Sequence, residues 1–124
     1  MILRVTQYDE AILRRPGIAV ENFDEQLGLL AEDMIETMRE EEGIGLAAHQ
    51  VGRAIRMFVM DIRPAASEAA SPCVLDGRKL PLDIVMPMIL VNPEIETYGE
   101  ELTWEEGCLS LPEIRGDVTR PSHA

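Results

Sequence analysis

Apolar residues recur at spacings of three and four between residues 24 and 41, which predicts one amphipathic helix. The apolar positions of this stretch are Leu27, Leu30, Ala31, Met34, Ile35 and Met38. Such a stripe is typical of a helix that packs one face on a core. Asn22 is the predicted N-cap, because Glu25 follows it at capping-box spacing. Gly43 stands where a C-capping glycine is expected.

Shorter apolar runs elsewhere in the chain predict strands. They cover residues 55–62, 85–92, 94–104 and 114–120. The first 22 residues predict an extended arm, and residues 64–81, rich in turn-forming and small residues, predict a loop. One helix among several strands, without regular alternation of strands and helices, predicts an α+β fold.

The length, the net charge and the absence of long apolar runs in the sequence limit the size of the fold and the classes of partner. The 124 residues have the length of one domain, and their formal net charge of −12 disfavours nucleic acid or an anionic membrane as a main partner. No apolar run approaches the roughly 20 residues of a membrane span. The N-terminus does not resemble a signal peptide, so a cytoplasmic protein is expected.

The string GIGLAAHQ at residues 43–50 has the composition of a ligand-facing segment. Gly43 and Gly45 allow the backbone to approach a ligand closely. The side-chain amide of Gln50 can donate a hydrogen bond to a developing oxyanion. The alternative is a helix C-cap followed by a strand of small residues.

The string EGCLS at residues 106–110 presents a thiol after a glycine. The thiolate of Cys108 is a soft ligand suited to Zn²⁺ or Fe²⁺, and the backbone N–H of Leu109 can form half of an oxyanion hole beside Gln50. Two alternatives stay open here. Cys108 is a free cysteine buried in a turn, or it is a nucleophile paired with His49 or His123.

Together, the two strings resemble the peptide deformylase family. Further matches to the family pattern are Leu13-Arg14, Asp33-Met34, Thr37-Met38, Gln50-Val51-Gly52, Asn92-Pro93 and Arg120-Pro121. The resemblance covers residues 1–121. It implies an α+β fold of antiparallel strands around helices, and residues 1–124 are expected to form a single deformylase-like domain.

The resemblance also implies an activity and a site. Family members hydrolyse the N-formyl group from the N-terminal formyl-methionine of nascent polypeptides, using Fe²⁺, with Zn²⁺ or Ni²⁺ as substitutes. It assigns Cys108 as a metal ligand, and Gln50 and the Leu109 N–H as oxyanion donors. It assigns substrate binding to the segment Gly43, Ile44 and Gly45, and to Arg115. Formyl-methionyl peptides, and the ribosome through the family's task, are the implied partners.

One part of the family pattern is not present in the 124 residues. The other two metal ligands of the family are the histidines of a helical H-E-x-x-H, whereas this chain contains only His49 and His123, neither in that motif. A catalytic zinc or iron needs about three protein ligands. The domain is therefore expected to be incomplete, without the central C-terminal metal-binding helix, and inactive or impaired alone. The alternative function is a non-catalytic module that binds formyl-methionyl peptides or a partner chain.

Two structural expectations follow. Without the metal-binding helix, the stripe of Leu30, Met34 and Met38 is expected to be exposed. Glu106 and Arg120 have opposite charges and flank the Cys108 turn and the strand after it, so they are expected to form an ion pair that holds the turn.

Overall fold

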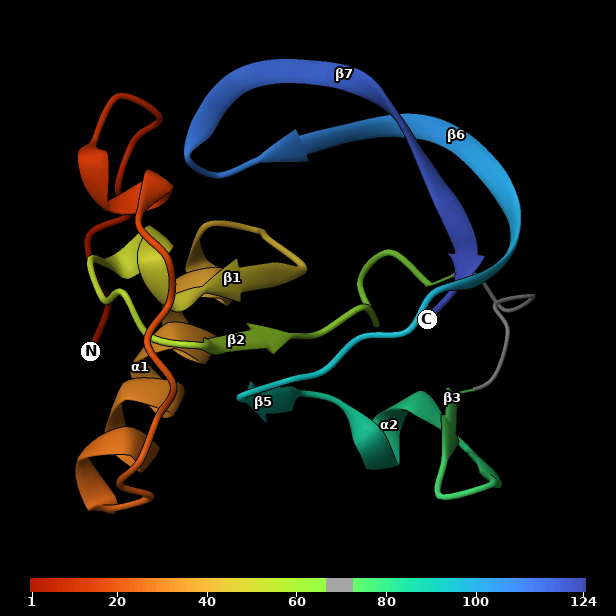
Figure 1. Cartoon of the computed structure of the whole chain (residues 1–124), viewed down its shortest axis with the longest axis horizontal. Helices are drawn as coiled ribbons and strands as arrows, with labels where there is room; N and C mark the ends of the chain where they lie inside the picture. Colours follow the sequence, from red (N-terminus) through yellow and green to blue (C-terminus); the bar gives the residue numbers. More distant parts are fainter. Residues whose placement is uncertain (67–72) are drawn as a thin grey trace.

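The computed structural model describes residues 1–66 and 73–124. In chain order its elements are η1 (Ala11–Arg14), α1 (Glu25–Glu40), β1 (Gly45–Ala47), η2 (Ala48–Val51), β2 (Met57–Met60), β3 (Cys73–Leu75), β4 (Arg78–Leu80), α2 (Leu82–Val85), β5 (Met88–Val91), β6 (Tyr98–Cys108) and β7 (Leu111–His123). Helix α1 lies against a three-stranded sheet, and β6 and β7 form an arch at one end of the molecule (Figure 1). The α+β prediction is confirmed.

The N-cap of helix α1 lies two residues after the predicted one. The prediction of Asn22 as N-cap is wrong, because the side chain of Asp24 accepts the backbone N–H of Leu27 at 3.0 Å. This bond satisfies one of the unpaired amides of the first helical turn. The helix otherwise matches the predicted range to within one residue.

Helix α1 ends in a Schellman motif that does not place glycine at the left-handed position. The N–H of Gly43 donates to Met38 O at 2.8 Å, and the N–H of Glu42 donates to Arg39 O at 3.1 Å. Glu42 has a φ of 56°, so it occupies the left-handed position that glycine usually takes. Gly43 follows that position by one residue, so helix capping does not explain why this residue is a glycine.

The core forms between α1 and one face of the sheet. The sheet has the order β1-β2-β5, and both pairings are antiparallel. The buried cluster consists of Ala31, Met34, Met38, Leu46, Ala48, Met57 and Val59. The expectation that Met34 and Met38 would be exposed is wrong, because both pack against β1 and β2 and have no exposed surface. Leu30 is half-buried at the edge of this cluster.

The segment between β2 and β5 departs from the predicted loop. Strands β3 and β4 pair as a short hairpin inside the range 64–81. Asp76 and Gly77 have φ values of 50° and 76°, the positive values that a two-residue type I′ turn needs. Residues 67–72 of the predicted loop lie outside the described part. Residues 82–85 form α2, so β5 is shorter than the predicted strand.

Strand β6 lies four residues later in the chain than the predicted strand 94–104, and β7 is longer than the predicted strand 114–120. The two strands pair with each other as a two-stranded ribbon. Their antiparallel register aligns Trp104 with Val118 and Gly107 with Arg115, and it shifts next to Cys108. Alternate residues of a strand point to opposite faces. One face of the ribbon therefore carries Leu102, Trp104 and Val118, whereas the other face is polar.

The N-terminal arm links the two halves of the fold. Its amide N–H groups donate to three separate segments: Leu3 to Thr37 Oγ1 at 2.8 Å, Thr6 to Gln50 O at 2.7 Å, and Tyr8 to Ser110 O at 2.9 Å. The arm thereby joins α1, η2 and the β6–β7 turn. No helix in the described ranges is long and apolar enough to cross a membrane.

Candidate functional site

Gln50 and Cys108 lie together although 58 residues separate them in the sequence. Gln50 is in η2, where its Oε1 accepts the backbone N–H of Ala47 at 3.0 Å. An N–H donor must meet the amide oxygen, so this bond fixes the orientation of the amide group. Gln50 Nε2 consequently faces Cys108 Sγ at 3.6 Å and Ser110 Oγ at 3.3 Å.

The Cys108 turn is held by the residues that follow the cysteine. Ser110 is buried, and its carbonyl accepts the N–H of Tyr8. The side chain of Leu109 packs against the core cluster. Cys108 itself remains exposed. The alternative of a free cysteine buried in the turn is therefore wrong, because Leu109 and Ser110, and not Cys108, are the residues of this turn that pack into the fold.

Gly43 packs closely against the Cys108 turn. A Cβ atom on this residue would lie 2.9 Å from Leu109 Cδ1 and 3.5 Å from Met38 O. Contacts of 2.9 Å are shorter than carbon atoms tolerate, so any side chain here would displace the leucine. The absence of a side chain at Gly43 thus lets the 43–50 segment and the Cys108 turn come together.

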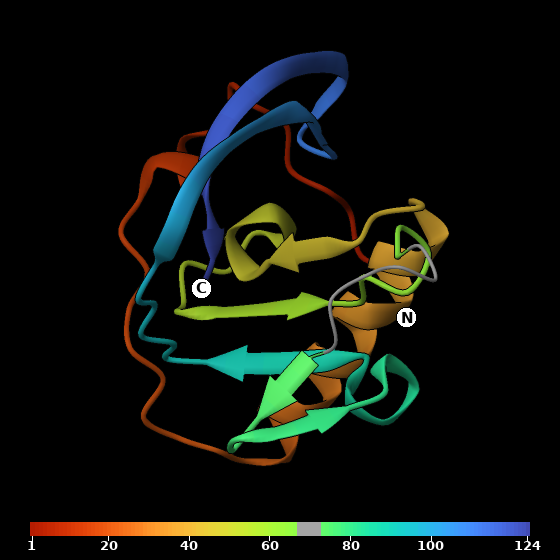
Figure 2. The same cartoon turned by 90° about the vertical axis from the view of Figure 1, so that its right-hand side faces the viewer.

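Strand β1 forms an edge of the sheet (Figure 2). It pairs with β2 on one side, and within the described ranges no strand pairs with its other side. Ile44, just before this strand, is 46% exposed, and Gly45 is also exposed. An exposed strand edge offers backbone N–H and C=O groups to an extended peptide.

Arg115 lies across the ribbon from the glycine that precedes Cys108. Its Nε donates to Glu105 Oε1 at 2.5 Å. A Cβ atom on Gly107 would lie 2.9 Å from Arg115 Nη1, so the guanidinium group extends over that glycine. The structure thus places Arg115 beside the Cys108 turn, at an exposed position.

The predicted pairing of Glu106 with Arg120 is confirmed. Arg120 Nε donates to Glu106 Oε2 at 2.7 Å, and Arg120 Nη2 donates to Glu106 Oε1 at 2.8 Å. The indole N–H of Trp104 also donates to Glu106 Oε2. The bonds from Arg120, followed by the one from Trp104, hold the pKa of Glu106 below its ordinary value. The pair joins β6 to β7 two residues before Cys108.

Sequence reasoning missed Asp61, which is hydrogen-bonded to the 43–50 segment through its backbone. Its backbone N–H donates to Ile44 O at 2.9 Å. Its buried carboxylate accepts two side-chain hydrogen bonds from Arg63, at 2.9 and 2.7 Å, and lies 3.6 Å from Arg39. These bonds lower the pKa of Asp61 to about 2. An acidic residue at the end of a strand gave no signal of burial in the sequence.

The described ranges do not bring a complete set of metal ligands to Cys108. They contain no group of three His, Cys, Asp or Glu side chains placed to hold a metal ion. His49 Nε2 lies 2.9 Å from Arg15 O, and His123 stacks on Tyr98 with ring centroids 4.9 Å apart. Among the residues that the structure describes, the hydrogen-bond partner of the Cys108 thiol is Gln50 Nε2, so the geometry does not favour a cysteine–histidine nucleophile.

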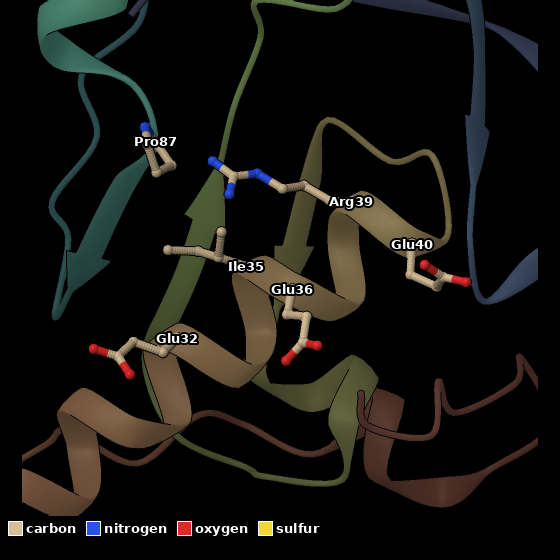
Figure 3. A pocket seen from close by; sticks show the side chains of 6 residues that line it. All are labelled: Glu32, Ile35, Glu36, Arg39, Glu40 and Pro87. Carbon is tan, nitrogen blue, oxygen red and sulfur yellow. The ribbon is translucent and has the colours of Figure 1, made fainter. Parts of the chain in front are cut away.

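A shallow pocket on α1 lies apart from these residues. Figure 3 shows its lining, which is Glu32, Ile35, Glu36, Arg39, Glu40 and Pro87. None of these belongs to either motif. The candidate site is therefore the surface formed by Gln50, the Cys108 turn and the edge of β1.

A family model described as "Polypeptide deformylase" matches residues 2–124. The chain belongs to the polypeptide deformylase family. It is 50% identical to a peptide deformylase of Opitutus terrae over 123 residues, which are 98% of this chain and 63% of that protein. The chain thus spans less than two thirds of the length of this curated relative.

Solved structures of peptide deformylases have the same fold. The structure from Thermotoga maritima matches with a TM-score of 0.76 at 35% identity, covering 98% of this chain and 69% of the other. The structure from Ehrlichia chaffeensis matches with a TM-score of 0.80 at 30% identity, covering 98% and 64%. The resemblance inferred from the two motifs therefore holds for both sequence and fold.

Proposed function

We propose that this chain serves the hydrolysis of the N-formyl group from formyl-methionyl peptides, the reaction for which its relatives are named. The observation that carries the proposal is the 3.6 Å contact between Gln50 Nε2 and Cys108 Sγ. It brings an amide donor and a potential thiolate ligand to one exposed point. Metal-assisted hydrolysis of an amide uses a bound metal ion to activate water and a hydrogen-bond donor to stabilise the developing oxyanion, and a thiolate is one kind of ligand for such a metal.

Gln50 and the Leu109 N–H are the proposed oxyanion donors. The orientation of Gln50 is supported by the bond from Ala47, which leaves Nε2 free to point toward the thiol. A donor that is held in place before the reaction stabilises the developing negative charge without reorganisation. Leu109 contributes by its backbone, while its side chain anchors the turn in the core.

The edge of β1 is the proposed peptide-binding surface. Gly43, Ile44 and Gly45 would line the methionine side chain and pair with the peptide backbone, and Arg115 would contact the peptide from the ribbon. Support comes from the exposed position of β1 at the sheet edge and from the exposed side chain of Ile44. Strand addition of this kind supplies affinity through main-chain hydrogen bonds.

Cys108 is the proposed metal ligand, with Fe²⁺ as the proposed metal and Zn²⁺ or Ni²⁺ as substitutes. Its thiolate suits each of these ions. The described residues do not fit a complete site, because three protein ligands are needed and only one is brought to this point. We therefore infer that residues 1–124 alone are inactive or impaired. A cytoplasmic location and work near the ribosome belong to the same proposal.

The test separates binding from hydrolysis. Formyl-Met-Ala-Ser and unformylated Met-Ala-Ser are titrated into the chain, with backbone amide shifts of Gly45 and Leu46 as the readout, while formate release and bound metal are measured in parallel. Selective binding of the formylated peptide is expected. Gln50→Leu should weaken it by about tenfold, the value of about 1.4 kcal/mol expected for a hydrogen bond made by a polar ligand. Gln26→Leu, on the exposed face of α1, is the matched control.

The measurements also decide between the two functions considered. Binding without formate release favours a non-catalytic module for formyl-methionyl peptides, and the intact edge of β1 is the observation in its favour. Formate release with stoichiometric metal, lost in Cys108→Ala but kept in Cys73→Ala, would show that this chain alone is active. Equal affinity for both peptides would contradict the proposed substrate.

A further inference from the structure

The side-chain amide of Gln50 is held at both of its ends. Its Oε1 accepts the backbone N–H of Ala47 at 3.0 Å. Its Nε2 lies 3.3 Å from Ser110 Oγ and 3.6 Å from Cys108 Sγ. A glutamine amide has two N–H donors. The two donors are therefore divided between two acceptors, the hydroxyl of Ser110 and the thiol of Cys108.

The two acceptors differ in their exposure. Only 3% of the surface of Ser110 is exposed, so its hydroxyl has little access to water and needs a partner within the protein. Cys108 is exposed, and a ligand can therefore approach its side of the amide. One N–H of Gln50 is thus directed to a buried oxygen, whereas the other is directed to an exposed sulfur.

The N-terminal arm holds Gln50 and Ser110 at a fixed separation. The N–H of Thr6 donates to Gln50 O at 2.7 Å, and the N–H of Tyr8 donates to Ser110 O at 2.9 Å. The hydroxyl of Thr6, which is buried, also donates to His49 O at 3.0 Å. The hydrogen bond between the side chains of Gln50 and Ser110 therefore spans two backbone segments that are tied to the same arm.

The bond from Ala47 alone does not place the amino end of the amide. It decides which end of the group is the oxygen, but the last side-chain torsion of a glutamine is broad, so the amide can still turn about that bond. The bond to Ser110 fixes the plane of the amide. An oxyanion donor is most effective when it is held in place before the reaction. Without the Ser110 acceptor, Nε2 could turn away from Cys108 while the bond from Ala47 persists.

We propose that Ser110 is a positioning residue that acts through Gln50. Its hydroxyl accepts one N–H of the amide and thereby directs the other toward the point at which the oxyanion would form. The role toward the oxyanion rests on the function proposed above, whereas the direction of the amide can be tested independently of it. The hydroxyl thus has a task separate from that of the Ser110 carbonyl, which anchors the turn to the arm.

The first measurement is solvent exchange of the side-chain amide protons, followed by NMR. In the parent chain the amide of Gln50 should exchange more slowly than that of Gln26, which is exposed on α1. Ser110→Ala should accelerate the exchange of Gln50 about fivefold, the effect of losing one neutral hydrogen bond. Ser110→Thr retains a hydroxyl and should retain the slow exchange.

Two results of this measurement would overturn the proposal. One is an amide of Gln50 that exchanges as fast as that of Gln26 in the parent chain. This comparison needs no variant, so it decides the matter even if Ser110→Ala does not fold. The other is an exchange rate of Gln50 that is the same in Ser110→Ala as in the parent chain.

Thr37→Val is the matched control for a general loss of stability. Thr37 is buried like Ser110, but its hydroxyl accepts the N–H of Leu3 and donates to Asp33 O. This variant should lower the thermal stability and leave the exchange of the Gln50 amide unchanged. An equal acceleration in Thr37→Val and Ser110→Ala would show that stability alone is responsible, and would overturn the proposal.

The second measurement is the ratio of the affinities for formyl-Met-Ala-Ser and Met-Ala-Ser. Ser110→Ala should reduce this ratio about fivefold, because only the formylated peptide presents a carbonyl to Gln50. A purely structural effect would weaken both peptides alike, and an unchanged ratio would overturn the positioning role. If the parent chain shows no preference, the proposed function is overturned together with the role toward the oxyanion, while the exchange rates still decide whether Ser110 directs the amide.

Discussion

Gly43 is the residue at which the two motifs meet. Its φ is not in the left-handed region, and the left-handed cap residue of α1 is Glu42 instead. The reason for a glycine is space, because the side chain of Leu109 fills the volume that a Cβ would need. Because Gly43 has no side chain, Leu109 of the Cys108 turn can pack against the end of α1.

The substitution Gly43→Ala is expected to destabilise the protein by about 1–3 kcal/mol, the usual range for forcing a methyl group into a packed site. It should also move Leu109 and weaken the contact between Gln50 and Cys108. Thermal unfolding and the amide shift of Leu109 measure the two effects. The matched control is Gly28→Ala in α1, where an added Cβ meets nothing within 4 Å. This control should stabilise by about 0.5–1 kcal/mol, and equal effects of both substitutions would contradict the packing argument.

Among the elements, α1 is a regular amphipathic helix whose C-terminal motif has a non-glycine residue at the left-handed position. Its apolar stripe packs on the sheet, and both hydrogen bonds of the Schellman motif are present. The left-handed position nevertheless holds Glu42, whose Cβ makes that conformation unfavourable. The end of the helix is therefore held in place against a local backbone cost.

Replacing Glu42 with glycine is expected to stabilise the chain by about 1 kcal/mol, because a glycine adopts the left-handed conformation without strain. The midpoint of urea unfolding should rise while the slope stays unchanged. Glu41→Gly, at the preceding residue with φ of −83°, is the control and should not stabilise. A loss of stability in Glu42→Gly would indicate that the side chain contributes more than the strain costs.

The same elements show what the sequence could and could not predict. The period of α1 is clear in the sequence because its apolar residues lie on the one face that packs against the core, and so its range was predicted to within a residue. The β3–β4 hairpin was missed although Asp76-Gly77 is a turn signal, because the flanking strands are only three residues long. The contact of Gln50 with Cys108 could not be derived from spacing, since it depends on the arm and on the ribbon; the family resemblance indicated it.

At the scale of the whole molecule, Asp61 joins parts of the chain that lie far apart in sequence. It pairs with Arg63, which lies 3.5 Å from Asp83 at α2, and with Arg39 of α1. The pKa of Asp61 falls from 3.8 to about 2 on folding. Its ionised form is therefore favoured by the folded state, and its contribution is complete above the unfolded pKa and lost as the pH falls toward 2.

The shift corresponds to about 2 kcal/mol of stability at neutral pH. We expect Asp61→Asn to lose at least this amount at pH 7, and to show a flatter dependence of stability on pH between 4 and 2 than the parent chain. Urea unfolding at several pH values measures both. Asp83→Asn alters the same network at a side chain that is 88% exposed, and should change little. Parallel pH curves for the parent chain and Asp61→Asn would count against the linkage.

Trp104, whose indole N–H donates to Glu106, is a built-in fluorescent probe of the β6–β7 ribbon. The chain contains one tryptophan, and its side chain is half exposed in the β6–β7 ribbon, far along the strand from the core between α1 and the sheet. Tryptophan fluorescence, excited selectively over the two tyrosines, therefore reports on the ribbon, whereas the helical signal in far-ultraviolet circular dichroism reports on α1. Following both signals during unfolding distinguishes an opening of the ribbon from the loss of the core, without any added label.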